Sequence, residues 1–204
     1  MFVVAGRHDW RALSSFAYGL PLTRSKPPVA LLVPADYPER LLHRFDDSLV
    51  RASLAGAAAP GELRESFDLL IGVEWGHALL KASEVTSKQK YLNELMASYL
   101  FVSALYSSGA DATAERLQAW ATFQCAGCGL DELPLSAVRY PRAKMPFAEA
   151  LLAQGVLMNR ALVLAQQEGW QLALDFWAAQ AGEERLTVLK ERLGFADGKL
   201  KAAG

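Results

Sequence analysis

Two consecutive stretches of the chain have the apolar spacing of long amphipathic helices, and they limit the fold more than any other feature. From Glu62 to about Ala82, apolar side chains recur three or four residues apart, or at multiples of that spacing. A similar stretch begins at Ser87 and ends at the Ser107-Ser108-Gly109 break. The apolar positions are Leu63, Phe67, Leu70, Val73 and Leu80, then Tyr91, Leu95, Tyr99, Val102 and Tyr106. We expect the two helices to form a hairpin, because only a short segment joins them.

The first third of the chain contains the runs that are typical of strands. Phe2 to Ala5 and Val29 to Val33 are short, apolar and rich in β-branched residues, so each predicts a strand. Asp9 is placed to cap a helix that extends to about residue 18, and residues 35–45 predict a further helical segment. Residues 48–58 fit either a strand with a turn or a frayed helix, and we favour the strand.

The second half predicts mostly helices, separated by one polar, proline-marked loop over 127–145. The expected helices span about 113–124, 146–168, 170–179 and 183–193. Residues 196–204 are mostly small or polar, which favours a mobile tail. The sequence therefore predicts one α+β domain over 1–204. A small N-terminal β-sheet, within residues 1–83, packs on the long helix that begins at Glu62, and a mostly α-helical part follows over 84–195.

Composition narrows the classes of partner and compartment. Hydrophobic residues make up 52% of the 204 residues, and 21 basic against 22 acidic residues give a net charge of -1. Without a basic patch, binding to nucleic acid or to an anionic membrane is not expected. The only cysteines, Cys125 and Cys128, are too few for a disulfide framework and fit two small buried thiols in a cytoplasmic protein. The N-terminus also lacks the features of a secretory signal.

The segment Ile-Gly-Val-Glu-Trp-Gly-His-Ala-Leu-Leu, residues 71–80, places two reactive side chains on the first helix. Glu74 and His77 are three residues apart and therefore share one face of that helix. The second helix contains Asn93-Glu94, followed by Ala97. If Glu94 faces the first helix, a buried carboxylate–imidazolium pair would orient the hairpin without any metal.

Together, Glu-Trp-Gly-His-Ala-Leu and Asn-Glu-x-x-Ala resemble the paired signatures of the gluzincin branch of zincin metallopeptidases, H-E-x-x-H and N-E-x-x-A. The resemblance covers about residues 28–105. It implies that Glu74 matches the general base, while His77 and Glu94 match two zinc ligands. Val73 stands where the first histidine ligand is expected, and its side chain has no lone pair. Since a catalytic zinc normally has three protein ligands, this resemblance implies a vestigial site.

The function expected from this pattern is that of a degenerate, inactive zincin-like domain, a pseudoenzyme without a cofactor that binds a peptide or protein or has a structural role. One alternative is an active zinc hydrolase with a substitute ligand, such as His43 or a cysteine, in which Glu74 acts as general base on metal-bound water. Another is a plain helical protein-interaction module. A sheet packed against the Glu74 helix would favour the first reading over the last.

Overall fold

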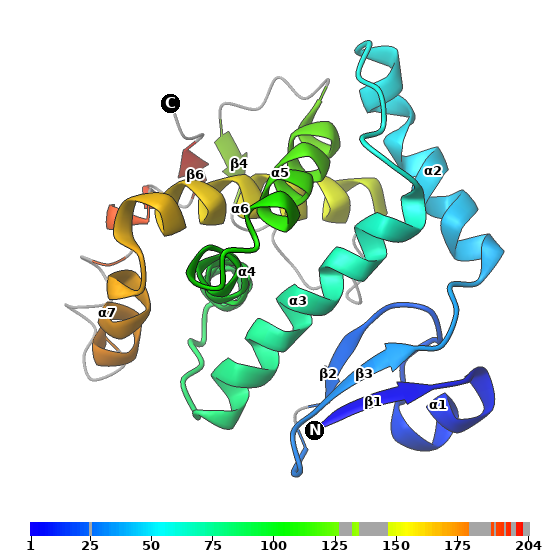
Figure 1. The fold of residues 1–204 in the computed structure, drawn as a ribbon, viewed down its shortest axis with the longest axis horizontal. Helices are drawn as coiled ribbons and strands as arrows, with labels where there is room; N and C mark the ends of the chain where they lie inside the picture. The colour runs from blue at the N-terminus through cyan, green and yellow to red at the C-terminus, as the bar shows by residue number, and fades with distance from the viewer. Residues whose placement is uncertain are drawn as a thin grey trace.

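The computed structural model describes residues 1–24, 26–126, 132–134, 147–179, 189, 191–193, 195–196 and 199–201. Within them the protein is a mixed α+β structure in which helices predominate. Figure 1 shows the N-terminal sheet at one end of the molecule, with the long helix α3 (Leu63–Ala82) between that sheet and the helices that follow α3 in the chain. The fold class agrees with the α+β prediction. Most of the loop expected over 127–145, most of the helix expected over 183–193, and Cys128 lie outside the described residues.

The N-terminal sheet confirms both strand predictions. It contains β1 (Phe2–Ala5), β2 (Leu22–Arg24) and β3 (Ala30–Pro34) in the order β1-β3-β2. The central strand, β3, is buried along its whole length and pairs parallel with β1 and antiparallel with β2. Helix α1 (Arg7–Leu13) begins directly after Gly6 and ends before Ser14, so the prediction of Asp9 as its N-cap was wrong.

Helix α2 (Glu39–Leu54) corrects the preference for a strand over residues 48–58. Phe45, Leu49 and Ala52 are buried at helical spacing, and the helix continues to Leu54. Gly56 then adopts a φ of 79°, and the N–H of Ala57 donates to the carbonyl of Ala52 over 3.0 Å. These are features of a Schellman C-cap, in which a glycine in the left-handed region ends a helix. Gly56 is therefore a helix terminator, although in the sequence it resembles a turn after a strand.

Helices α3 (Leu63–Ala82) and α4 (Lys90–Ser107) form the predicted hairpin. Small residues allow the two backbones to approach closely: a methyl carbon added to Gly76 would lie 2.8 Å from both the Cα and the carbonyl carbon of Ala97. Ala97 is fully buried. Asn93 closes the connection between the helices, because its side chain accepts from the N–H of Ser87 and donates to the carbonyl of Ser87, each over 2.8 Å.

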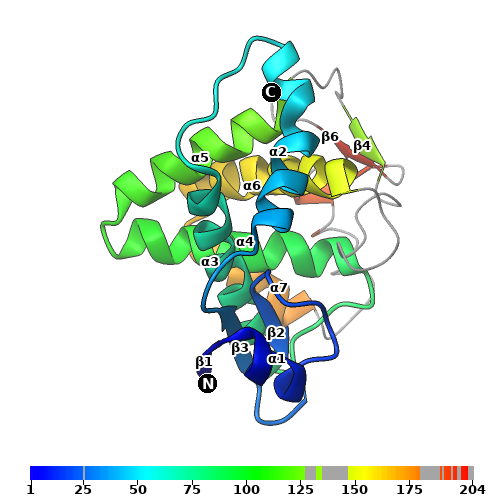
Figure 2. The same ribbon diagram turned by 90° about the vertical axis from the view of Figure 1, so that its right-hand side faces the viewer.

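Three further helices complete the core: α5 (Asp111–Cys125), α6 (Phe147–Glu168) and α7 (Gln171–Ala179). Helix α6 packs against both α4 and α5, and Figure 2 shows it crossing the helical half of the molecule behind α2 (Glu39–Leu54). In the described part of the chain, α6 is the one helix long and apolar enough to cross a membrane, by length and composition alone. Its most apolar window is 56% buried within the protein, which is also typical of a central core helix.

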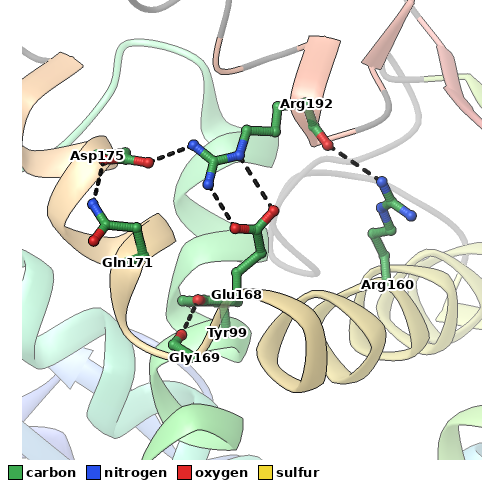
Figure 3. A network of polar contacts seen from close by, with 7 residues as sticks. All are labelled: Tyr99, Arg160, Glu168, Gly169, Gln171, Asp175 and Arg192. Atoms are coloured by element: carbon green, nitrogen blue, oxygen red, sulfur yellow. Dashed lines mark hydrogen bonds and ion pairs between the residues drawn. The ribbon is translucent and has the colours of Figure 1, made fainter.

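The C-terminal segment returns to the helical core. Arg192 forms ion pairs with Glu168, over 2.6 Å, and with Asp175, and its backbone carbonyl accepts from Arg160 Nη2 over 3.4 Å (Figure 3). Arg160 Nε donates to the next carbonyl, that of Leu193, over 3.0 Å. Strands β4 (Glu132–Pro134), β5 (Phe195–Ala196) and β6 (Lys199–Lys201) form a second, antiparallel sheet in the order β4-β6-β5. The prediction of a mobile tail over 196–204 was therefore wrong for Ala196 and for residues 199–201, which pair within this sheet.

Candidate functional site

The N-terminal sheet packs directly on the helix that contains Glu74. Thr23, on β2, is 5% exposed, and its hydroxyl donates to the backbone carbonyl of Glu74 over 2.6 Å. Both β2 and β3 contact α3. The sheet therefore fixes the position of the central turn of α3, as the α+β prediction requires.

The hairpin brings His77 and Glu94 into direct contact. His77 Nε2 lies 3.0 Å from Glu94 Oε2, with the imidazole almost fully buried and the carboxylate 20% exposed. The spacing of residues along the two helices explains this contact. Gly76 packs on Ala97, and this close approach places His77 of α3 beside Glu94 of α4. The predicted carboxylate–imidazole pair is thus present, and it links α3 to α4.

The charge of His77 depends on its carboxylate neighbours. Burial alone lowers the pKa of His77, because a charged imidazolium is poorly solvated inside the protein. The charge and hydrogen bond of Glu94 and the charge of Glu74 act in the opposite direction and outweigh burial, although Lys81 opposes them. The net result is a pKa of His77 above its ordinary value, which favours an imidazolium that donates to Glu94.

A cavity of about 420 Å³ lies beside this pair. Val73, Glu74 and Glu94 line it from the hairpin, and Val73 is 6% exposed. The other lining residues come from residues 16–22, from α2, from further positions of α3 and α4, and from α6. The apolar ones are Phe16, Ala17, Leu20, Pro21, Leu22, Leu41, Phe67, Leu70, Phe147, Ala150, Leu151, Ala153 and Leu157, and the polar ones are Tyr18, Arg44, Ser98 and Gln154. The cavity is therefore mainly apolar, with two carboxylates on the hairpin side.

The side chains around this cavity do not fit a catalytic zinc. In the part of the chain that the structure describes, no group of three or more His, Cys, Asp or Glu side chains is arranged to hold a metal. Val73 lines the cavity at the position where the resemblance expects a third donor, and neither a histidine nor a cysteine is among the described residues that line the cavity. His8 and His43 are both exposed, and Cys125 is contacted by Asn159 from α6 over 3.8 Å. His43 is therefore not placed as a substitute ligand.

The sequence motifs identify only the hairpin side of the cavity. Arg44, Gln154 and the loop at residues 16–22 come from distant parts of the chain, and no local spacing connects them to Glu74. The turn signals Gly19 and Pro21 indicate a loop there without showing what it faces. Comparisons of the chain with protein families, with characterised proteins and with solved structures found no match.

Proposed function

We propose that this chain is a degenerate zincin-like domain of the gluzincin type, without peptidase activity, which binds a peptide or protein segment in the cavity beside Glu74 and Glu94. The observation that supports this most is the position of Val73. It lines the cavity and is 6% exposed, at the point where the resemblance expects a zinc ligand. A cytoplasmic location stays a prediction.

The absence of peptidase activity follows from the chemistry of the motif residues. Metal-assisted hydrolysis needs an ion held by enough donors to polarise water, and such sites usually have three protein ligands. In this chain a hydrogen bond of 3.0 Å, and therefore a proton, lies between His77 Nε2 and Glu94 Oε2. A metal would have to displace that proton, because ligating side chains must present lone pairs. With valine at the third position, nothing offsets that cost.

The proposal of a binding role is based on the cavity itself. Ligand sites in proteins are typically concave, largely apolar and about 300–1,000 Å³ in volume, with a few polar groups that orient the ligand. The cavity has about 420 Å³, mostly apolar walls and two carboxylates on the hairpin side. The resemblance to peptidases makes a peptide the expected class of ligand, so binding without cleavage is the function that we propose.

The other two functions are less well supported. An active hydrolase needs a third donor, and both His8 and His43 are exposed. A plain helical interaction module would not need a sheet on the Glu74 helix, whereas Thr23 of β2 bonds to the backbone of that residue. The degenerate zincin-like domain accommodates both the sheet and the missing ligand.

A binding assay with a cavity-filling variant tests the proposal. Ala150 is 6% exposed and lines the cavity from α6, so Ala150→Phe should fill part of it. A pool of short peptides, analysed by affinity selection and mass spectrometry, should yield uncleaved peptides that bind the native protein and not Ala150→Phe. The matched control is Ala119→Phe, at an exposed position of α5 outside the cavity lining. Circular dichroism should show both variants folded.

Peptide cleavage is followed in the same samples, with added zinc and with a chelator. Cleavage that requires zinc and is abolished by the chelator would overturn the proposal in favour of an active hydrolase. Equal peptide capture by the native protein and Ala150→Phe, or capture of no peptide by the folded native protein, would overturn the binding role.

A further inference from the structure

We infer that the cavity receives the C-terminal end of a peptide, whose free carboxylate pairs with Arg44 while its last apolar side chains lie along the walls. This inference rests on the proposed function and names the part of the peptide that is recognised. Three features of the cavity support it: one accessible cation, the apolar surface beside that cation, and the distance between the cation and the acidic side chains of the hairpin.

Arg44 places an accessible positive charge at the cavity. It lies on α2, is exposed, and is the one basic residue among the described residues that line the cavity. Its guanidinium lies 5.3 Å from the centre of the Phe147 ring, and none of the ion pairs within the described part of the chain includes it. A guanidinium has five N–H donors in a planar fork, which matches the two oxygens of a carboxylate. An anion that enters beside Phe147 can therefore pair with Arg44 without displacing a described carboxylate.

The walls beside Arg44 are apolar and aromatic. Leu41 precedes it by one helical turn, and Phe147 and Leu151, one turn apart on α6, continue the lining. Apolar side chains gain from burial against such walls, whereas peptide N–H and C=O groups without partners are costly to bury. A C-terminus ends the backbone at the carboxylate, so it buries fewer peptide groups than an acidic side chain in the middle of a peptide. The walls therefore favour an apolar C-terminal residue.

Arg44 reaches the cavity away from the acidic side chains of the hairpin. Phe45, the next residue of α2, packs on Phe67 of α3 with 4.6 Å between their ring centres, and 6.3 Å separates the rings of Phe45 and Phe147. Glu74 is seven residues beyond Phe67 in α3, which is about 10 Å along the helix axis. The acidic side chain contributed by α4 contacts the following turn of α3. A carboxylate at Arg44 therefore avoids both, and about three extended peptide residues span the distance between.

Isothermal titration calorimetry with three N-acetylated peptides tests the inference. The first is Ala-Phe-Leu with a free C-terminal carboxylate, the second is its C-terminal amide, and the third is Ala-Phe-Asp-amide, whose only carboxylate is a side chain. The first should bind the native protein about tenfold or more tightly than the second, because it alone can pair with the guanidinium. If the third binds as tightly as the first, an acidic side chain suffices and recognition of the C-terminus is wrong.

Arg44→Met removes the charge and keeps a long apolar side chain. In this variant the preference for the free carboxylate over the amide should disappear, whereas it should persist in Arg40→Met, at an exposed position one turn earlier in α2. If Arg44→Met weakens binding of both peptides equally and leaves the preference unchanged, Arg44 only shapes the cavity and the inference is overturned.

The same measurements separate this inference from the proposed function. Circular dichroism should first show that the variants are folded. If the acid and the amide bind the native protein equally and both are lost in Ala150→Phe, the carboxylate inference fails while the binding function survives. If the native protein binds none of the three peptides, the inference fails, and if it also captures no peptide from the pool, the proposed function fails with it.

Discussion

The close contact between α3 and α4 predicts that Gly76 is the least replaceable residue of the hairpin. In Gly76→Ala the new methyl carbon would lie 2.8 Å from two backbone atoms of Ala97, whereas carbon atoms in contact are normally about 3.5–4.0 Å apart. The helices must therefore separate by roughly 1 Å. Overpacking of this kind costs about 1–3 kcal/mol, and a backbone obstacle favours the upper end. Alanine regains about 1 kcal/mol of helix propensity, so a net loss of about 2 kcal/mol is expected.

Gly72→Ala is the matched control, because it makes the same chemical change one turn earlier in α3. There the obstacle is the outer edge of the Phe101 ring, which is only half-buried and can turn aside. Urea denaturation followed by circular dichroism should place Gly72→Ala within about 1 kcal/mol of the native protein and Gly76→Ala about 2 kcal/mol below it. A Gly76→Ala protein as stable as the native one would refute the close approach of the two helices.

Three other predictions test neighbouring features. Glu94 raises the pKa of His77, so the stabilisation that the His77 proton provides is fully present below about pH 6.5 and is lost as the pH rises through the folded-state pKa. The free energy of unfolding of Glu94→Gln, measured by urea denaturation, should therefore change less with pH across that range than that of the native protein. Glu84 follows the C-cap of α3 and has a φ of 55°, a left-handed conformation that glycine adopts without strain. Glu84→Gly should therefore raise the melting temperature by relieving about 1 kcal/mol of strain. A lower melting temperature would count against this conformation. Arg192→Met should cost only about 1 kcal/mol, since the ion pair with Glu168 is partly exposed, and a loss above about 3 kcal/mol in the same denaturation assay would contradict a surface network.

The helical hairpin and its polar contact were predictable because both depend on local spacing. The apolar positions of α3 and α4 fix which faces meet, and the positions of His77 and Glu94 on those faces bring them together. The strands β1 and β3 were equally clear as short β-branched runs. Helix ends were less predictable, because Gly56 has the same sequence signature whether it follows a strand or caps a helix.

The cavity depends on tertiary contacts that no local pattern contains. Arg44 and Phe147 are about a hundred positions apart in the chain, yet they contact each other at its wall. The C-terminal strand β6 was missed for a similar reason, because residues 199–201 pair with β4 and β5 and have no strong apolar alternation of their own. Sequence spacing therefore predicts the hairpin side of the candidate site but not the other walls of the cavity.

Zinc titration of the native protein beside Val73→His tests the central claim most directly. Val73, His77 and Glu94 correspond to the three ligand positions of the resemblance, and only the first lacks a donor. Calorimetry with both proteins in metal-free buffer at pH 7.5 should give no stoichiometric zinc binding for the native chain. For Val73→His it should give one zinc ion per chain. One tightly bound zinc in the native protein would contradict the account, because a donor other than residue 73 would then complete the site.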